Sequence, residues 1–304
     1  MTKLSVIIVS YNTAQLTVQA VRSVLATGVG AADLEIIVVD NNSHDETLAE
    51  LKKIKDKRLK LVESGENLGF GRGNNLGIVH SQGSYYLFLN SDTLVKPGAL
   101  ETLLKTYRQQ EKQGVKLGLL AAGLRNPDGT YQVQGGDLPS LIAAASQWWF
   151  WDDLPLIGKY LPSIQKTGRN WRKSVHWQGW VGGTAVMVNR DLLERFGAWD
   201  EKIFMYGEDI DLSWRLFKAG YKNGLVPAAE IIHFGQASSS SKNAILGEVK
   251  GLLYVWEKYC GSRGLWCLKK IIAWGCILRI LFYSIQAKRE QQKIYGEALE
   301  VVRQ

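Results

Sequence analysis

The sequence predicts an α/β fold in which a mostly parallel, doubly wound sheet is covered by helices on both faces. Short apolar segments alternate with amphipathic helical segments through the first half of the 304-residue chain, and this alternation is typical of parallel sheets. Polar residues stand directly where apolar segments end, as at Ser10 and Asp40. A basic, aromatic segment with helical spacing closes the chain, so we expect a helical C-terminal extension.

The expected elements alternate regularly through the first third of the chain. Ser43 is a plausible N-cap for the second helix, with Glu46 three residues later completing a capping box. Pro97 opens a later helix at its first turn, where no backbone N–H is needed. The elements are strands at Leu4–Val9, Leu34–Val39, 58–62 and 85–89, and helices at 13–26, 45–55, 74–80 and after Pro97.

The second half is less regular. Residues 128–175 form an irregular stretch that contains the aromatic cluster Trp148–Trp151, and we interpret it as an insertion or a lid. We therefore place one domain at residues 1–240, with this insertion inside it, and a helical tail at 241–304. The later elements are strands at Trp180–Val188 and Ala229–His233 and helices at Arg190–Phe196 and 208–219.

Composition and charge exclude several classes of protein. A hydrophobic content of 46% with 22% charged residues is ordinary for a globular protein. Residues 236–304 hold eleven Lys and Arg against five Asp and Glu, so this tail carries most of the net charge of +8. This distribution argues against a nucleic-acid groove in the main domain and indicates an anionic surface near the tail.

The N-terminal segment and the cysteines predict the compartment. The chain enters a strand at Leu4 without the basic and apolar regions of a signal peptide, so we expect a cytoplasmic protein. Cys260, Cys267 and Cys276 match no zinc spacing, and we expect reduced thiols. No uninterrupted apolar run is long enough to span a bilayer.

A glycine-rich segment at Glu66–Asn75 opens a helix. Backbone N–H groups there could hold a phosphate, with Arg72 adding a planar cation. The alternative is a tight turn that needs glycine only for its backbone freedom. A dinucleotide-binding loop is disfavoured because the turn after the first strand, Ser10–Asn12, contains no glycine, and no Walker A lysine loop is present.

Carboxylates and one histidine stand at the ends of the expected elements. Asp40 either accepts hydrogen bonds from a nucleotide or caps a loop. Asp92 follows a buried strand, where a carboxylate suits a hard divalent cation that bridges to phosphate. Asp209 either favours the positive end of a helix or draws a proton from an attacking hydroxyl. His233 is either structural or completes a metal site with Asp92.

Together these segments resemble the family 2 glycosyltransferases, inverting enzymes with the GT-A fold, and most closely the bacterial branch that includes rhamnosyltransferases of polysaccharide assembly. Their order and spacing hold from about residue 4 to 240. The segments that carry the resemblance are Ser5–Asn12, Val38–Ser43, Asn67–Asn75, Leu89–Asp92, Trp180–Ala185, Phe196–Asp200, Tyr206–Leu212 and Ile232–His233.

The resemblance implies roles for individual residues. Asp92, at the end of the family's Asp-x-Asp motif, and His233 would bind Mg²⁺ or Mn²⁺ on the donor diphosphate, although Asn90 replaces the first acid of that motif. Asp209 would be the general base. The implied acceptor contacts are Glu208, Trp180, Gly182 and Gly183. The implied nucleotide-sugar contacts are Ser10, Tyr11, Asn12, Asp40, Asn67, Gly69, Arg72, Asn74, Asn90 and Ser91.

The implied reaction is a metal-dependent, inverting hexosyl transfer in cell-surface polysaccharide assembly. The sugar, with L-rhamnose from dTDP-rhamnose the leading candidate, would pass to a hydroxyl of a glycan or lipid-linked acceptor. A UDP-hexose or UDP-galactofuranose donor is the first alternative. A nucleotidyltransferase and a non-catalytic sugar-binding protein are more distant alternatives.

The tail interleaves apolar and basic residues. An interfacial helix of this kind would hold the enzyme at the inner face of the cell membrane, close to a lipid-linked acceptor. The alternative is a helix that packs on the catalytic domain or on a second subunit of a homodimer. The apolar positions are Leu265, Trp266, Ile271, Ile272, Trp274, Leu278, Ile280, Leu281 and Phe282, and the basic ones are Lys269, Lys270, Arg279, Lys288 and Arg289.

Overall fold

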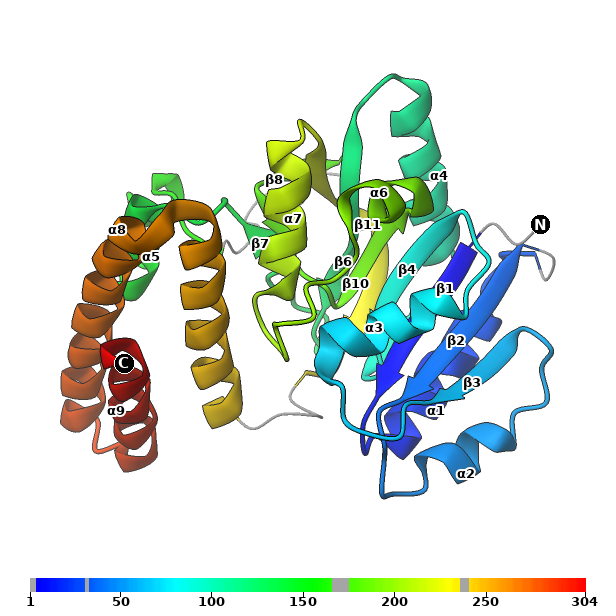
Figure 1. Cartoon of the computed structure of the whole chain (residues 1–304), viewed down its shortest axis with the longest axis horizontal. Coiled ribbons are helices and arrows are strands. Elements are labelled where there is room, and N and C mark those ends of the chain that lie inside the picture. Colours follow the sequence, from blue (N-terminus) through cyan, green and yellow to red (C-terminus); the bar gives the residue numbers. More distant parts are fainter. Residues whose placement is uncertain (1–3, 31–32, 166–174, 236–240) are drawn as a thin grey trace. The chain divides into compact units, whose positions relative to one another are not determined.

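A computed structural model of the protein describes residues 4–30, 33–165, 175–235 and 241–304. The chain divides into two compact units (Figure 1). The expected insertion does not belong to one unit alone, because the boundary falls after Gln134. The first unit comprises Met1–Gln134, Thr167–Phe204 and Glu208–Ser238, and the second comprises Gly135–Lys166, Met205–Gly207 and Ser239–Gln304.

The first unit is built on a mixed sheet that has nine strands among the described residues, in the order β3-β2-β1-β4-β10-β6-β11-β5, with β8 paired to β11. Six strands run in one direction, and β5, β8 and β10 run against them. The strands are β1 Leu4–Ser10, β2 Leu34–Asp40, β3 Leu59–Glu63, β4 Tyr85–Asn90, β5 Thr93–Val95, β6 Leu117–Arg125, β8 His176–Gln178, β10 Ala185–Asn189 and β11 Lys222–His233.

Helices cover both faces of this sheet, as the doubly wound prediction requires (Figure 1). Every residue of β2 is buried, and alternate side chains along a strand point to opposite faces. Ile36 therefore joins one apolar core and Ile37 the other. The first core includes α1 Ala14–Leu25, α2 Thr47–Lys52 and α4 Ala99–Lys112, and the second includes α3 Gly69–Val79, α6 Arg190–Phe196 and α7 Glu208–Lys218.

The glycines of α3 bring this helix close to the sheet. A Cβ atom on Gly77 would lie 2.4 Å from Cγ2 of Ile7, and one on Gly73 would lie 2.9 Å from Cγ1 of Val9. Such distances leave no room for a methyl group. The helix begins at Gly69, five residues before the expected start, so much of the glycine-rich segment is helix packed on β1.

Three local predictions are wrong. Ser43 does not cap α2, because its Oγ accepts the backbone N–H of Asn12 at 3.0 Å; the N–H of Thr47 at the start of α2 is bound by Asp45 instead. Pro97 precedes α4 by two residues, and Gly98 with φ of 78° is the N-cap. The strand expected over Trp180–Val188 is two strands, β9 Trp180–Val181 and β10, interrupted before Ala185.

The second unit is mostly helical. Two helical segments of α8 meet at Gly261, whose φ of 67° is not helical. The C-terminal helix contacts both segments, since Lys242 pairs with Glu297 at 2.7 Å and Tyr283 stacks on Tyr295. The elements are β7 Gly135–Gly136, α5 Leu141–Trp148, a 3₁₀ turn at Gly158–Tyr160, α8 Ser241–Ile285 and α9 Arg289–Arg303.

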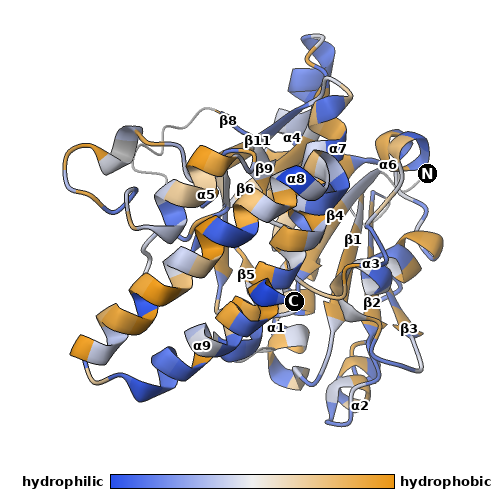
Figure 2. Ribbon diagram, turned by 60° about the vertical axis from the view of Figure 1, so that its left-hand side comes forward, coloured by the Kyte–Doolittle hydropathy of each residue, from blue (hydrophilic) through white to orange (hydrophobic). Residues whose placement is uncertain are grey.

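The two long helices of this unit differ in character. The second half of α8 is predominantly hydrophobic and α9 is largely hydrophilic (Figure 2). Across the described ranges, none of the helices has both the length and the apolarity to cross a membrane.

Candidate active site

The polar residues that follow β1, β2 and β4 share one edge of the sheet. Ser10 is in register with Asp40, and Val9 is in register with Asn90. The backbone N–H of Asn41 donates to the carbonyl of Ser10 at 2.7 Å, which holds the first two strand ends together. In open α/β sheets this edge is where ligands bind.

Asp40 carries an unused buried acceptor at this edge. Its side chain is 2% exposed. Oδ2 accepts the N–H of Ser43 at 3.0 Å, whereas Oδ1 has no hydrogen-bond partner among the described residues. A buried carboxylate oxygen without a donor is costly. The arrangement therefore fits a ligand that supplies an N–H or O–H, as the base or ribose of a nucleotide does.

The turn after β1 is tied to the loop after β2. Asn12, with φ of 53°, donates its N–H to Ser43 and accepts the N–H of His44 at 2.7 Å. Tyr11 is half-buried beside it. The Ser10 hydroxyl, in contrast, is turned inward and shares a hydrogen bond with Thr17 at 2.7 Å. Tyr11 and Asn12 therefore lie at the sheet edge, whereas the Ser10 side chain is hydrogen-bonded inside the fold.

Asn41, which sequence reasoning missed, links this edge to the glycine-rich segment. Its Nδ2 donates to Asn67 Oδ1 at 3.1 Å and to the carbonyl of Gly69 at 3.0 Å. Asn67 and Gly69 therefore lie beside Asp40. Arg72 instead pairs with the exposed Glu66 at 3.2 Å.

Two further residues that were predicted to contact the nucleotide-sugar use their polar side chains in hydrogen bonds within the protein. Asn74 is 1% exposed, and its amide donates to the carbonyl of Phe70 one turn earlier at 3.0 Å. Ser91 Oγ accepts from Thr13 Oγ1 at 3.1 Å. These two side chains hold α3 and the β4 end in place.

Asp92 and His233 meet at the end of β4. His233 Nε2 lies 3.2 Å from Asp92 Oδ1, and the carbonyl of Asp92 accepts the N–H of Phe234 at 2.9 Å. The antiparallel pairing of β5 with β11 brings the two residues together, with His233 opposite Thr93. Both side chains are largely buried, so the pair is preorganised.

Gln132, a second residue missed from the sequence, fixes the histidine tautomer. Its amide nitrogen donates to the carbonyl of His233 at 2.7 Å and to Asn126 Oδ1 at 2.6 Å. Because these partners are acceptors, the amide oxygen faces His233 Nδ1, at 2.8 Å. Nδ1 must then carry the proton, and Nε2 presents its lone pair or a second proton to Asp92.

This geometry fits a divalent cation. Two acceptors that face each other at 3.2 Å need a proton or a cation between them, and neighbouring ligands of an octahedral Mg²⁺ lie about 3 Å apart. In the described parts of the chain no cluster of three or more His, Cys, Asp or Glu side chains suited to a metal occurs. Two protein ligands suffice where phosphate oxygens of the substrate complete the shell.

The acidic pair at the start of α7 is held against the turn between β9 and β10. Asp209 Oδ2 accepts the N–H of Gly183 at 3.2 Å, and Oδ1 accepts the N–H of Ile210 at 2.8 Å. A Cβ on Gly182 would lie 3.0 Å from Gln134 Oε1. A Cβ on Gly183 would lie 3.1 Å from the ring of Phe70, so the absence of side chains at both glycines lets this turn pack closely beside Asp209. Trp180, two residues earlier, is buried at 8% exposed.

Burial perturbs both acids of this pair. Desolvation by burial raises the pKa of Asp209 from 3.8 to about 6, against hydrogen bonds that lower it. Burial and the Asp209 charge raise the pKa of Glu208 to about 8. Glu208 Oε2 has no partner in the portion of the chain that is described. Perturbed, buried carboxyl groups of this kind are typical of catalytic sites.

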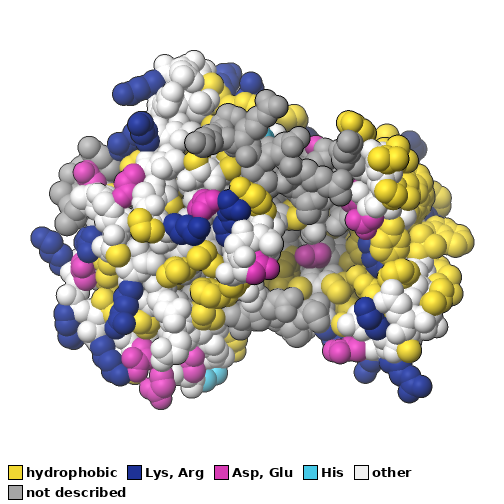
Figure 3. All heavy atoms as spheres, turned by 180° about the vertical axis from the view of Figure 1, so that it is seen from behind, with side chains coloured by type: hydrophobic (Ala, Val, Ile, Leu, Met, Phe, Trp, Pro, Cys, Tyr) yellow, Lys and Arg dark blue, Asp and Glu magenta, His cyan; other side chains and the backbone are white. Residues whose placement is uncertain are grey.

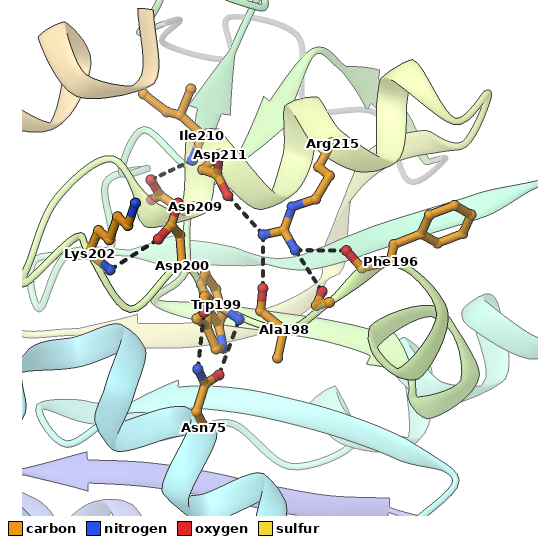
Figure 4. A network of polar contacts seen from close by, with 11 residues as sticks. Asn75, Phe196, Ala198, Trp199, Asp200, Lys202, Asp209, Ile210, Asp211 and Arg215 are labelled. Atoms are coloured by element: carbon orange, nitrogen blue, oxygen red, sulfur yellow. Dashed lines mark hydrogen bonds and ion pairs between the residues drawn. The ribbon is translucent and has the colours of Figure 1, made fainter. Parts of the chain in front are cut away.

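A polar network anchors the segment before α7 (Figure 4). Arg215 pairs with the buried Asp211 at 2.8 Å and donates to the carbonyls of Phe196, Gly197 and Ala198. Asn75 in turn binds both backbone groups of Trp199. Asp211 is thus the structural member of the three acids at the start of α7, and it leaves Glu208 and Asp209 for chemistry.

The two acidic centres are connected through the turn that precedes β10. The N–H of Asn90 donates to the carbonyl of Thr184 at 2.8 Å, and Gly183 next to Thr184 binds Asp209. Asn90 stands two residues before Asp92 on the same strand end. Residues from the first and last thirds of the chain therefore converge on one edge of the sheet.

Comparison with known proteins agrees with this arrangement. The model of glycosyl transferase family 2 matches residues 5–151. The chain is 29% identical over 215 residues to the N-acetylglucosaminyl-diphospho-decaprenol L-rhamnosyltransferase of Mycobacterium tuberculosis (strain ATCC 25618 / H37Rv), covering 66% of each protein. It is 27% identical over 188 residues to rhamnosyltransferase WbbL of Escherichia coli (strain K12), covering 59% of this chain and 65% of the relative.

Solved structures share the fold at low identity. The crystal structure of GalNAc-T7 with UDP, GalNAc and Mn²⁺ matches 86% of this chain and 49% of its own at 16% identity, with a TM-score of 0.61. Mannosyltransferase PcManGT from Pyrobaculum calidifontis, in complex with GDP-Man and Mn²⁺, matches 98% and 74% at 17% identity, also with a TM-score of 0.61.

These likenesses confirm the expected GT-A fold class with its helical C-terminal region. The matched family model, the similar rhamnosyltransferases and the shared fold all agree with the resemblance seen in the sequence motifs. Residues 5–151 match the family 2 glycosyltransferases, and the chain resembles the rhamnosyltransferases among them.

Proposed function

We propose that this protein transfers a sugar, with inversion, from a nucleotide-activated donor to a hydroxyl of a glycan or lipid-linked acceptor in cell-surface polysaccharide assembly. The observation that carries the proposal is the convergence of the Asp92–His233 pair and the buried Asp209 on one sheet edge. One group of residues suits a donor diphosphate and the other suits an acceptor hydroxyl.

The donor side of the site would use Asp40, Asn12 and the Asp92–His233 pair. The unpartnered Oδ1 of Asp40 supports a contact to the nucleoside. Asp92 and His233 would hold Mg²⁺ or Mn²⁺, which when bound neutralises charge on the departing nucleoside diphosphate. The names of the similar rhamnosyltransferases favour L-rhamnose as the transferred sugar; dTDP-L-rhamnose is the proposed donor, and UDP-hexose and UDP-galactofuranose are the alternatives.

The acceptor side would use Asp209 as general base. Its carboxylate takes the proton of the acceptor hydroxyl while that oxygen bonds to the anomeric carbon and the bond to the diphosphate oxygen breaks. Attack from the face opposite the leaving group inverts the configuration, and no covalent enzyme intermediate forms. A base whose pKa lies at about 6 is ionised near neutral pH and still basic enough to accept a proton.

Glu208 would act differently from Asp209. With its pKa raised to about 8, Glu208 keeps its proton at neutral pH and can donate a hydrogen bond to an acceptor oxygen. Gly182 and Gly183 would shape the space beside Asp209, and Trp180 would support them from within the fold. The two neighbouring acids thus divide the roles of proton acceptor and hydrogen-bond donor.

A lipid-linked acceptor would place the reaction at a membrane surface. We propose a cytoplasmic protein that is peripheral at the inner face of the cell membrane, in keeping with the basic and aromatic tail. A homodimer formed through the same tail is the alternative assembly.

A donor panel tests the proposed function. The purified protein is incubated with Mn²⁺, dTDP-L-rhamnose, UDP-hexoses or UDP-galactofuranose, and a lipid-diphosphate-linked sugar acceptor. We expect one donor to give glycoside and nucleoside diphosphate in equal amounts. NMR of the glycoside should show the anomeric configuration opposite to that of the donor. Retention of configuration, or pyrophosphate release from free nucleoside triphosphates, would reject the proposal.

A further inference from the structure

The second half of α8 presents an apolar face that the unit itself does not cover. The positions recur at intervals of three, four and eight residues, which places them along one side of a helix. At the far end, Ile285 is 87% exposed, and near the start Trp266 is 63% exposed. We call this set the outer face of α8; it consists of Trp266, Trp274, Leu278, Leu281, Phe282 and Ile285.

The opposite side of the same helix is already used. Leu268, Ile272 and Cys276 are fully buried, and a Cβ on Gly275 would lie 2.8 Å from Cβ of Trp148 at the end of α5. Arg279 also faces inward, over the rings of Trp148, Phe150 and Tyr295. Packing within the unit therefore accounts for one side of α8 and leaves the outer face without a function.

The segment after α5 extends the outer face. Trp149 donates its Nε1–H to the carbonyl of Ile271 at 3.1 Å, and Phe150 lies 5.9 Å from Phe282 between ring centroids. Trp151 packs edge-on against Trp149. Hydrophobic side chains gather on this unit in Figure 3. The exposed apolar residues that follow are Leu154, Leu156, Ile157 and Tyr160.

The charges along the second half of α8 and the start of α9 are almost all positive, whereas the segment after α5 contains Asp152 and Asp153. From Lys258 to Lys293 the chain has eight Lys and Arg and a single acid, Glu290. Lys270 lies over the ring of Trp266, with its Nζ 5.5 Å from the centroid. Cations therefore stand at both ends of the apolar face: Arg263, Lys269 and Lys270 at the start, and Lys288, Arg289 and Lys293 beyond the end.

This combination selects a partner. Aromatic and branched side chains flanked by Lys and Arg bind the boundary between headgroups and acyl chains, with the cations at anionic headgroups. A second copy of the chain fits less well, because pairing two such faces would bring like charges together. Tryptophan also favours an interface that is apolar on one side and wet on the other.

We propose that the outer face of α8, with the segment from Phe150 to Tyr160, docks this protein on a bilayer that contains anionic lipids. The apolar side chains enter the headgroup boundary, and the basic residues at the two ends of the face contact lipid phosphates. The proposal rests on the proposed function for its purpose, because a lipid-linked acceptor lies in such a surface. Docking itself requires no catalysis.

Vesicle sedimentation with the full chain tests the proposal. Vesicles of phosphatidylcholine alone are compared with vesicles that also contain phosphatidylglycerol. We expect binding to the mixed vesicles that falls with salt. A variant carrying Trp274→Ser, Leu281→Ser and Ile285→Ser should bind roughly tenfold or more weakly. The control variant Val79→Ser/Phe217→Ser removes two other exposed apolar side chains, both from the first unit, and should bind as the wild type does.

A charge variant and an activity readout separate the outcomes. Lys288→Gln/Arg289→Gln/Lys293→Gln should weaken binding only to the mixed vesicles. Equal binding by the wild type and the outer-face variant, or concentration-dependent dimers that the outer-face variant loses, would overturn the proposal in favour of another use of this face. Transfer to a water-soluble acceptor should be unchanged in both variants. A wild-type protein that binds the vesicles but transfers no sugar would instead count against the proposed function alone.

Discussion

The backbone N–H of Gly183 donates to Asp209 Oδ2 at 3.2 Å, so the proposed base is oriented by main chain rather than by another side chain. Gly183 belongs to the turn between β9 and β10, and the next residue, Thr184, binds the backbone of Asn90. A side chain on Gly183 would press on Phe70, 3.1 Å from its Cβ. The position of Asp209 relative to the β4 end is therefore set by a short, rigid path.

The raised pKa of Asp209 predicts the pH dependence of transfer. Only the ionised form accepts a proton, so kcat should rise through a pKa of about 6, level off, and fall again as Glu208 loses its proton at a pKa of about 8. A pH–rate profile at saturating donor and acceptor checks this. A profile that is flat from about pH 5 to 8 would contradict a buried carboxylate base.

The same burial predicts a stability effect of Glu208. A carboxyl group whose pKa is raised in the folded state resists ionisation there, so its cost appears as pH rises above its ordinary pKa of 4.5. Glu208→Gln removes this cost. We expect the melting temperature of the variant to exceed that of the wild type at about pH 8 and to match it at about pH 4. Calorimetry in both buffers measures the difference, and equal shifts at both pH values would contradict the assignment.

Gln132→Leu should weaken binding of Mn²⁺ without unfolding the protein. Gln132 sets the tautomer and ring orientation of His233, and loss of such a partner typically costs about 10–100-fold in metal affinity. Titration calorimetry with Mn²⁺ and a nucleoside diphosphate measures the loss. The matched control Gln109→Leu changes an exposed glutamine on α4 and should bind as the wild type does. Unchanged affinity in Gln132→Leu would refute the tautomer argument.

Asp40→Asn should weaken binding of the donor nucleotide. The buried Oδ1 has no partner, and a hydrogen bond to a charged group contributes about 1.5–3 kcal/mol. Affinity for nucleoside diphosphate should therefore fall about tenfold or more, measured by calorimetric titration. The fold should survive, because an asparagine oxygen can still accept the N–H of Ser43. A variant with wild-type affinity would exclude Asp40 from the nucleotide site.

Gly77→Ala should destabilise the first unit. The new Cβ would lie 2.4 Å from Ile7 Cγ2, and overpacking of this kind costs about 1–3 kcal/mol. The matched control Gly296→Ala places a Cβ on α9 with nothing within 4 Å and should be stabilising by about 0.5–1 kcal/mol. Urea unfolding measures both, and equal signs would contradict the packing of α3.

The sequence was sufficient for the alternating architecture because β1, β2 and β4 are apolar on both faces and end in polar residues. It was insufficient for β5, which has three residues, and for β6, whose Leu, Ala and Gly residues have no strand preference. The pairing of β11 with both strands supplies their stability. Tertiary pairing of this kind leaves no local signal.

The candidate site divides in the same way. Asp92 and Asp209 stand out in the sequence because Asp92 follows a buried strand and Asp209 opens a helix together with two other acids. Gln132 and Asn41 do not, since their importance lies in partners about 101 and 26 residues away. From sequence alone, an amide side chain that hydrogen-bonds to a distant segment cannot be distinguished from one on the surface. The interleaved tail showed its amphipathic character, but not that Ile272 and Arg279 face inward.

Substitution of Asp209 by asparagine tests the central claim most directly. The variant keeps the size of the side chain and can still accept one of the two backbone N–H groups that bind Asp209, but its amide cannot accept the proton. With Mn²⁺, the active donor and the acceptor, kcat should fall by about 10²–10⁴-fold, while calorimetric titration shows unchanged donor affinity. An Asp209→Asn protein that releases nucleoside diphosphate and forms glycoside at the wild-type rate would contradict the account.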